Sequence, residues 1–232
     1  MLNFVIINRR NANMINNFIF DLGKVLVDYN PMRCILGYTR NISDANYIAS
    51  EVFASPEWVE LDRGTLTYEK ALEIWTSRMP DRLWQDLHTV VDNFHKHLPE
   101  KKEMTEIVKR LKDAGKKIYI LSNVSERFPL IVEGLEVMDI IDGYVASYQE
   151  KVVKPSPEIY SIILGRYSLV PEESIFIDDN ADNVLTAKKF GMAGYIFDGD
   201  AGKLESTFMK LGFFGETDEN INININEEIK NV

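Results

Sequence analysis

The sequence predicts an α/β fold in which a doubly wound parallel sheet carries an inserted, all-helical cap. Five short apolar runs alternate with helical patterns or with a long insertion, as expected for strands that are buried on both faces. Residues 31–98 instead contain several helical patterns and no strand pattern. We therefore expect an α/β core at residues 17–30 and 99–212, with the cap at 31–98.

Hydrophobic spacing places the individual elements. Residues 100–114 carry apolar side chains at helical spacing and end at Gly115, a residue suited to the left-handed position after a helix. Similar patterns predict helices at residues 156–167 and 181–190. The strands are expected at 17–20, 117–121, 143–147, 174–177 and 194–197, and the cap helices at 44–54, 56–61, 67–79 and 81–97.

The two ends of the chain differ from the middle in composition. Eleven of the eighteen asparagines lie in residues 1–17 and 220–232, as expected for segments outside a packed core. We expect an N-terminal extension at 1–16 whose first thirteen residues are dispensable. The Asn/Ile-rich tail at 213–232 alternates with period two at its centre, which predicts either an edge strand or a disordered segment.

Charge and cysteine content exclude several functional classes. The chain has 26 Lys and Arg against 36 Asp and Glu, a net charge of −10 that disfavours binding to nucleic-acid phosphates. Its one cysteine, Cys34, leaves no intramolecular disulfide, which fits a reducing cytoplasm. No run approaches the ~18 apolar residues of a membrane span. We expect a cytoplasmic protein without nucleic-acid or membrane partners; oligomeric state is left open.

Polar side chains follow the predicted strands at the points where these end. In open α/β sheets, reactive groups gather at the carboxyl ends of strands, and an insertion after the first strand would cover them. Carboxylates from two strands repel each other unless a hard cation lies between them, and Mg²⁺ with a substrate phosphate is the usual solution. A lysine would offset the remaining charge. The residues concerned are Asp21, Ser122, Asn123, Lys154, Asp178 and Asp179.

Four motifs at these strand ends carry a resemblance to a known family. They are FDLGKVL at 20–26, LSN at 121–123, KPSPEIY at 154–160 and FIDDNADN at 176–183. In this order they resemble the haloacid dehalogenase (HAD) superfamily, in its branch of metal-dependent phosphatases with a helical cap and a Rossmann-like core. The chain is similar to bacterial glucose-1-phosphate phosphatases and to the phosphatase domain of soluble epoxide hydrolase, including DRGTLT at 62–67.

The resemblance implies a phosphatase that acts on a small phosphorylated metabolite through an aspartyl-phosphate intermediate. Asp21 would be the nucleophile that takes the phosphoryl group. Ser122 and the Asn123 backbone would hold the phosphate, and Lys154 would stabilise the charge of nucleophile and phosphate together.

The resemblance also implies a Mg²⁺ site. Its ligands would be the Asp21 carboxylate, the Gly23 backbone carbonyl and one of two adjacent aspartates, of which Asp179 is favoured by its spacing to Asn183. Asp178 and Asn183 would act through water or orient the other groups.

Gly23 departs from the pattern of most phosphatases in the superfamily. They carry a second aspartate at this position, which acts as general acid and base, an effect worth ~10²–10⁴-fold. Gly23 therefore indicates slow turnover, a substrate with a good leaving group such as an anomeric hexose phosphate, or a substitute acid elsewhere. Since glucose-1-phosphate phosphatases share the glycine, it does not by itself imply a dead enzyme.

Other functions stay open at this point. A catalytically weak HAD-like binding or regulatory protein is the main alternative. A haloacid dehalogenase needs no metal and leaves the Asp178–Asp179 pair without a role, while a phosphomutase would need the aspartate that Gly23 replaces. Specificity is expected from the cap, where Trp58 and the other tryptophans pack internally or stack on a substrate.

Overall fold

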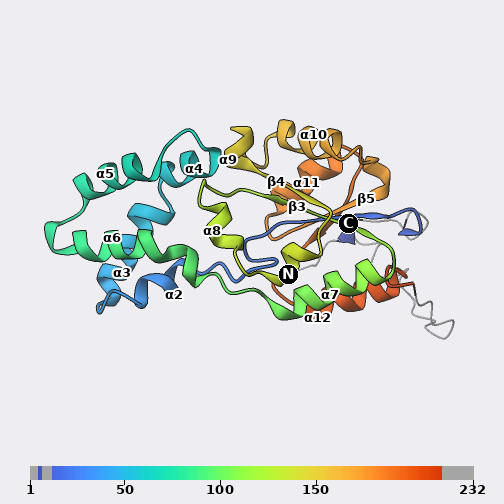
Figure 1. The fold of residues 1–232 in the computed structure, drawn as a ribbon, viewed down its shortest axis with the longest axis horizontal. Helices are drawn as coiled ribbons and strands as arrows, with labels where there is room; N and C mark the ends of the chain where they lie inside the picture. The colour runs from blue at the N-terminus through green and yellow to red at the C-terminus, as the bar shows by residue number, and fades with distance from the viewer. Residues whose placement is uncertain (1–4, 7–11, 216–232) are drawn as a thin grey trace, which may run out of the picture.

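The computed structural model describes residues 5–6 and 12–215. An α/β core and a group of helices lie next to each other along the longest axis of the molecule (Figure 1). This arrangement confirms the predicted fold class. The five predicted strands are present as β2 to β6, with each end within one residue of the prediction.

The sheet has six strands in the order β1-β6-β5-β2-β3-β4, and all neighbours are parallel except β1 and β6. Phe20, the last residue of β2, is paired with Ile120 of β3 and with Ile177 of β5. The residues that follow these strands therefore emerge at one edge. The strands are β1 (Val5–Ile6), β2 (Asn17–Phe20), β3 (Lys117–Ser122), β4 (Gly143–Ala146), β5 (Ser174–Asp178) and β6 (Ala193–Ile196).

Helices cover both faces of the sheet, so alternate residues of a strand enter two different cores. Phe18 and Phe20 belong to the core that α7 and α12 complete, whereas Ile19 belongs to the core under α10 and α11 (Figure 1). The core helices are α7 (Lys102–Asp113), α8 (Phe128–Val132), α9 (Ser147–Glu150), α10 (Pro157–Arg166), α11 (Ala181–Lys189) and α12 (Ala201–Lys210), with 3₁₀ turns η4 (Glu136–Asp139) and η5 (Pro171–Glu173).

The inserted segment is helical, as its pattern predicts. Side-chain caps define its helix starts: Ser55 accepts from the Trp58 amide and Thr67 from the Lys70 amide. The helices are α2 (Pro31–Leu36), α3 (Ile42–Ile48), α4 (Pro56–Arg63), α5 (Tyr68–Arg78) and α6 (Trp84–Asn93), with the π-helical turn η1 (Ala49–Phe53) and the 3₁₀ turns η2 (Asp81–Leu83) and η3 (Phe94–His97).

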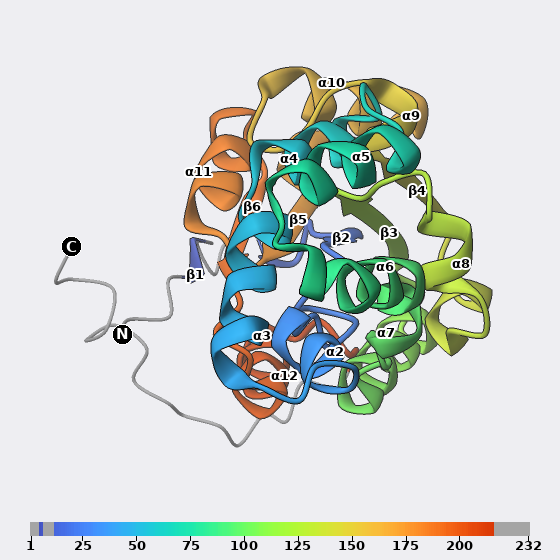
Figure 2. The same cartoon turned by 90° about the vertical axis from the view of Figure 1, so that its left-hand side faces the viewer.

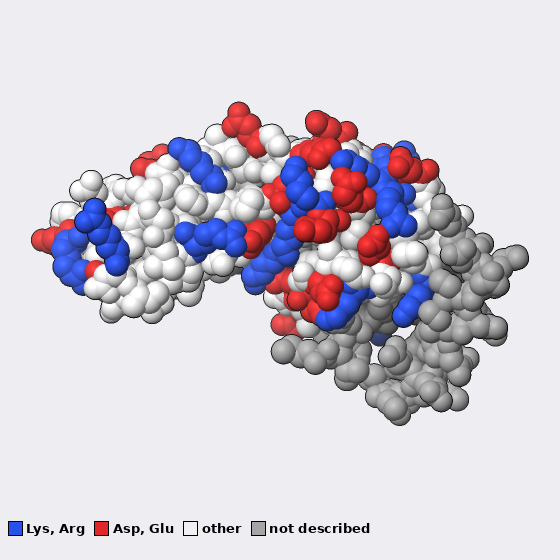
Figure 3. Space-filling model, turned by 90° about the horizontal axis from the view of Figure 1, so that it is seen from below, with Lys and Arg blue, Asp and Glu red and all other residues white. Residues whose placement is uncertain are grey.

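The cap lies over the carboxyl ends of the central strands. Figure 2, which looks from the cap side, shows the cap helices in front of β2, β3 and β5. In Figure 3, basic and acidic side chains are interspersed over the face in view, on both cap and core. No helix in residues 12–215 is long and apolar enough to cross a membrane.

The chain ends contribute more to the fold than composition predicts. Val5 and Ile6 form the edge strand β1 and pair with Tyr195 and Gly194 of β6. At the other end, Phe213 is buried and its ring centroid lies 5.0 Å from that of Phe18. The alternating residues of the C-terminal tail lie outside the described part of the chain.

Candidate active site

Asp21 stands at the edge of the sheet where β2 ends. Its backbone amide donates to the Ile177 carbonyl over 2.8 Å, which continues the β2–β5 pairing into this residue. Its Oδ1 atom accepts from the Leu22 amide at 2.7 Å and lies 2.8 Å from Lys154 Nζ. The carboxylate is therefore held from two sides.

Lys154 is a buried cation with its hydrogen-bonding capacity in use. Its Nζ atom lies 2.8 Å from both Asp21 and Asp178 and donates to the Leu121 carbonyl at 2.9 Å. The Asn123 side chain fixes the Lys154 backbone through two hydrogen bonds, of 2.7 and 3.0 Å. Burial opposes the charged form, but the two carboxylates outweigh it and raise the pKa of Lys154, so the lysine is protonated.

Burial dominates the electrostatics of Asp21. It raises the pKa of the carboxyl group from 3.8 to about 7, and the charge of Asp178 acts in the same direction. Lys154 and the Leu22 amide lower it but do not compensate fully. A cation beside Asp21 would add to their effect and keep the group ionised.

The two adjacent aspartates differ in their surroundings. Asp178 is fully buried and accepts from Lys154, from the Asn180 amide and from the Asn183 side chain at 2.8–3.0 Å. Asp179 is partly exposed, and its ion pair of 2.9 Å is with Lys24, an exposed side chain. Asp179 is thus the one of the two that can exchange its partner.

A metal ion fits these residues. Asp21, Asp178 and Asp179 each offer an oxygen atom, and the three oxygens lie within 4.8 Å of one another. Lys154 contacts one oxygen of Asp21 and one of Asp178, so these ion pairs do not use all the carboxylate oxygens. Three carboxylates facing one another are the donor set that a hard divalent cation prefers.

The predicted site residues form one site in two layers. A pocket of about 170 Å³ is lined by five of them, while the other three lie behind it and hold Asp21 and one another. The Ser122 hydroxyl has one long contact, 3.4 Å to the Asn123 carbonyl, so it is available to a ligand. The lining residues are Asp21, Gly23, Ser122, Asn123 and Asp179, and those behind are Lys154, Asp178 and Asn183.

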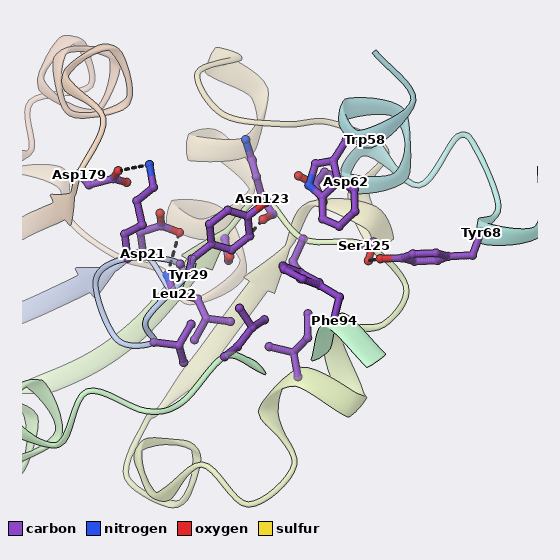
Figure 4. A pocket seen from close by; sticks show the side chains of 17 residues that line it. Asp21, Leu22, Tyr29, Trp58, Asp62, Tyr68, Phe94, Asn123, Ser125 and Asp179 are labelled. Carbon is purple, nitrogen blue, oxygen red and sulfur yellow. Dashed lines mark hydrogen bonds and ion pairs between the residues drawn. The ribbon is translucent and has the colours of Figure 1, made fainter. Parts of the chain in front are cut away.

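The rest of the pocket lining includes residues to which the sequence assigned no role. Tyr29, Asp62, Tyr68 and Phe94 line the pocket together with Trp58 (Figure 4). The Tyr68 hydroxyl forms a hydrogen bond of 2.9 Å with Ser125 Oγ. Trp58 lines the pocket and also packs inside the cap, with ring centroids 4.5 Å from Phe53 and 5.2 Å from Phe94. Both of its expected roles, internal packing and contact with a substrate, stay open. Asp62 belongs to the DRGTLT stretch at 62–67, but the resemblance assigned no chemical role to this stretch.

The environment of Asp62 resembles that of Asp21. Burial and the charge of Asp21 raise the pKa of Asp62 from 3.8 to about 7, and the charge of Lys154 lowers it by less. The same carboxylate contributes to the raised pKa of the Tyr29 phenol, after burial.

Tyr29 bounds the space beside Gly23. A Cβ atom at Gly23 would lie 3.7 Å from Cβ of Tyr29 and 3.9 Å from its ring. The position thus has room for a methyl group, but a longer side chain pointing this way would meet the ring. Tyr29 lines the same pocket as Asp21, Asp62 and Trp58 (Figure 4).

Comparison with known proteins identifies the family. Residues 15–191 match the haloacid dehalogenase-like hydrolases. The chain belongs to this family. The predicted superfamily and the prediction of a hydrolase are therefore confirmed.

Relatives of known name include both phosphatases and haloacid dehalogenases. The chain is 27% identical over 180 residues to a sesquiterpene phosphatase of Aspergillus oryzae, covering 76% of this chain and 86% of the relative. It is 24% identical over 197 residues to a D-ribitol-5-phosphate phosphatase of Bacteroides thetaiotaomicron, covering 77% and 89%. A HAD family enzyme from the same bacterium, solved with magnesium and inorganic phosphate, superposes with a TM-score of 0.66 at 22% identity, over 82% and 98% of the two chains. That similarity shows the shared fold.

Proposed function

We propose that the protein is a Mg²⁺-dependent phosphatase that hydrolyses a small phosphorylated metabolite through an aspartyl phosphate on Asp21. The observation that carries the proposal is the contact of 2.8 Å between Asp21 and the buried Lys154, at the base of a pocket that Ser122 also lines. A nucleophilic carboxylate beside a fixed cation is suited to phosphoryl transfer, in which positioning and charge stabilisation dominate. Phosphatases among the relatives support this reaction class.

Each residue has a defined part in this proposal. The Asp21 carboxylate attacks phosphorus, and Lys154 offsets the negative charge of nucleophile and phosphate. Ser122 and the Asn123 backbone bind phosphate oxygens from the pocket wall. Asp21, Asp179 and the Gly23 carbonyl would hold Mg²⁺, which when bound supplies further positive charge to the phosphate.

The pocket supports two classes of substrate. Trp58 offers a flat ring, while Asp62 and Ser125 offer hydrogen bonds, so a hexose ring with an anomeric phosphate can both stack and bond there. Apolar side chains of the same pocket, including Phe94 and Ile131, favour instead an alkyl or prenyl leaving group. The sesquiterpene phosphatase among the relatives makes this second class worth testing.

The test is phosphate release from both classes of ester, with Mg²⁺ and with a chelator. We expect turnover with Mg²⁺ that is lost in Asp21→Asn, because an amide is a poor nucleophile. Asp182→Asn is the matched control, since this aspartate is exposed and lies near the site on α11. Turnover that persists in Asp21→Asn would refute the mechanism, and a wild type that binds these esters without hydrolysing them would favour a regulatory protein.

A further inference from the structure

We propose that Asp62, a residue of the cap, protonates the leaving group and so takes the part that Gly23 leaves vacant. The inference rests on the proposed phosphatase function and adds a catalytic residue to it. The sequence left three explanations open for Gly23: slow turnover, a good leaving group, or a substitute acid elsewhere. The proposal corresponds to the third.

The position of Asp62 is the first argument. It lies in the last turn of α4 and lines the same pocket as Asp21 and Ser122, but from the cap side (Figure 4). A phosphate bound against Ser122 and Asp21 directs its ester oxygen away from the core, because attack and departure at phosphorus are in line. The departing oxygen therefore faces the wall that contains Asp62.

The second argument is that the Asp62 carboxylate has no competing structural task. Among residues 12–215, none donates a hydrogen bond to it, although it is partly buried. The other acids of α4 differ in this respect: Glu57 pairs with Arg78 and Glu60 with Arg63. A partly buried carboxyl group without a donor is free to give a proton to a ligand.

The core holds Asp62 in place. Ser147 Oγ of α9 donates to the Asp62 carbonyl at 2.5 Å, and Lys151 Nζ donates to the Gly64 carbonyl. Gly64 has a φ of +71°, and a Cβ atom there would lie 2.3 Å from the Tyr148 carbonyl oxygen. The turn after α4 is therefore pressed against α9, which fixes the acid relative to the sheet that carries Asp21.

Electrostatics support the assignment. Burial disfavours the charged form of Asp62, and ionisation would also place a second negative charge near Asp21, so the pKa of Asp62 rises to about 7. A general acid is most effective when its pKa lies near the working pH. Two carboxyl groups with one ionised and the other protonated provide a nucleophile and an acid in the same pocket.

The reaction balances with these two groups. An Asp21 oxygen forms a bond to phosphorus as the ester P–O bond breaks, and the Asp62 proton moves to the departing oxygen. The Asp62 carboxylate then takes a proton from a water molecule, whose oxygen attacks phosphorus. The bond between Asp21 and phosphorus breaks, and Asp21, protonated Asp62 and inorganic phosphate result.

The experiment compares wild type, Asp62→Asn and Glu73→Gln on aryl phosphates graded by the pKa of the phenol, with Mg²⁺. Glu73 is an exposed acid on cap helix α5 and serves as the control. We expect a shallow dependence of kcat/KM on leaving-group pKa for wild type and Glu73→Gln. For Asp62→Asn we expect a loss of about 10²–10⁴-fold with the poorest leaving groups and less than about tenfold with the best.

A second measurement separates catalysis from binding. With the best leaving group, acid-quenched Asp62→Asn should retain phosphate covalently on Asp21, because the base for water attack is missing, whereas wild type should retain little. Asp62→Ser, which also lacks a transferable carboxyl proton, should behave in the same way and covers the case in which the asparagine variant folds poorly.

Three results would overturn the assignment of Asp62. A loss in Asp62→Asn that is equal for all leaving groups, or confined to KM, would make it a binding residue. Wild-type rates in that variant would place the acid elsewhere. Absence of wild-type turnover, or turnover that survives Asp21→Asn, would instead refute the proposed phosphatase function. The two failures are therefore distinguishable, because the first concerns only the Asp62 variants.

Discussion

If Asp62 is kept at a cost in stability because it acts as the general acid, replacing it should stabilise the metal-free protein at neutral and alkaline pH. Its carboxyl group is partly buried, near Asp21, and accepts no hydrogen bond from residues 12–215. In the folded state the charged form is therefore unfavourable, which raises the pKa from 3.8 to about 7. Asn keeps the shape of the side chain and does not ionise.

The sign and size of the effect follow from linkage. An acid whose pKa is higher in the folded state costs stability above its unfolded pKa, because the unfolded chain ionises first. The full shift would correspond to about 4 kcal/mol above pH 7. Since Asp62 keeps some contact with water, we expect a gain of about 2 kcal/mol for Asp62→Asn at pH 8.

The assay is urea denaturation of wild type, Asp62→Asn and Glu73→Gln at several pH values with a chelator present. The gain of Asp62→Asn over wild type should be close to zero at pH 4, grow from pH 4 to 7 and level off above. The groups that face Asp62 are Asp21, Lys154 and the phenols of Tyr29 and Tyr68, and all are retained. A gain that is independent of pH, or a loss at pH 8, would refute the electrostatic reasoning.

Three further outcomes are expected. Mg²⁺ should raise the Tm of wild type and have a clearly smaller effect on Asp179→Asn; an equal shift would remove Asp179 from the metal site. Gly143→Ala should cost about 1–3 kcal/mol in urea denaturation, because its Cβ would lie 2.3 Å from the Tyr167 ring, whereas Gly165→Ala, with open space, should be neutral or stabilising. Deleting residues 1–13 should leave kcat/KM unchanged, since β6 and β5 separate β1 from β2; a loss of rate at full folding would contradict this.

Much of the fold could be predicted from the sequence because the strands are buried on both faces. Ile19 and its neighbours Phe18 and Phe20 are all fully buried, which requires a continuous apolar run, and such runs are easy to detect. The edge strand β1 also lies in a short apolar run, at residues 4–7, but this run is not part of the alternation of strands and helices that predicts the other strands. Its asparagine-rich surroundings resemble an unpacked extension.

The core half of the site could be predicted for a related reason. Asp21, Ser122 and Asp178 each directly follow or end a buried strand, and parallel strands bring their carboxyl ends together. Neither Asp62 nor Tyr29 directly follows a buried strand, so no such pattern in the sequence places them in the site. Asp62 reaches the site only through the docking of cap helix α4 on the core, which depends on contacts distant in sequence, such as the bond between Ser147 and the Asp62 carbonyl. Tyr29 lies in the loop between β2 and α2, outside any regular element.

An acid carried by the cap has a different mechanical basis from one carried beside the nucleophile. An aspartate at position 23 would be fixed by the same strand end as Asp21, whereas Asp62 reaches the pocket only while the turn at Gly64 lies against Tyr148. Correct protonation of the leaving group is then tied to correct docking of the cap. The wall that recognises the leaving group, with Trp58 one turn earlier on α4, therefore also carries the proton that the leaving group needs.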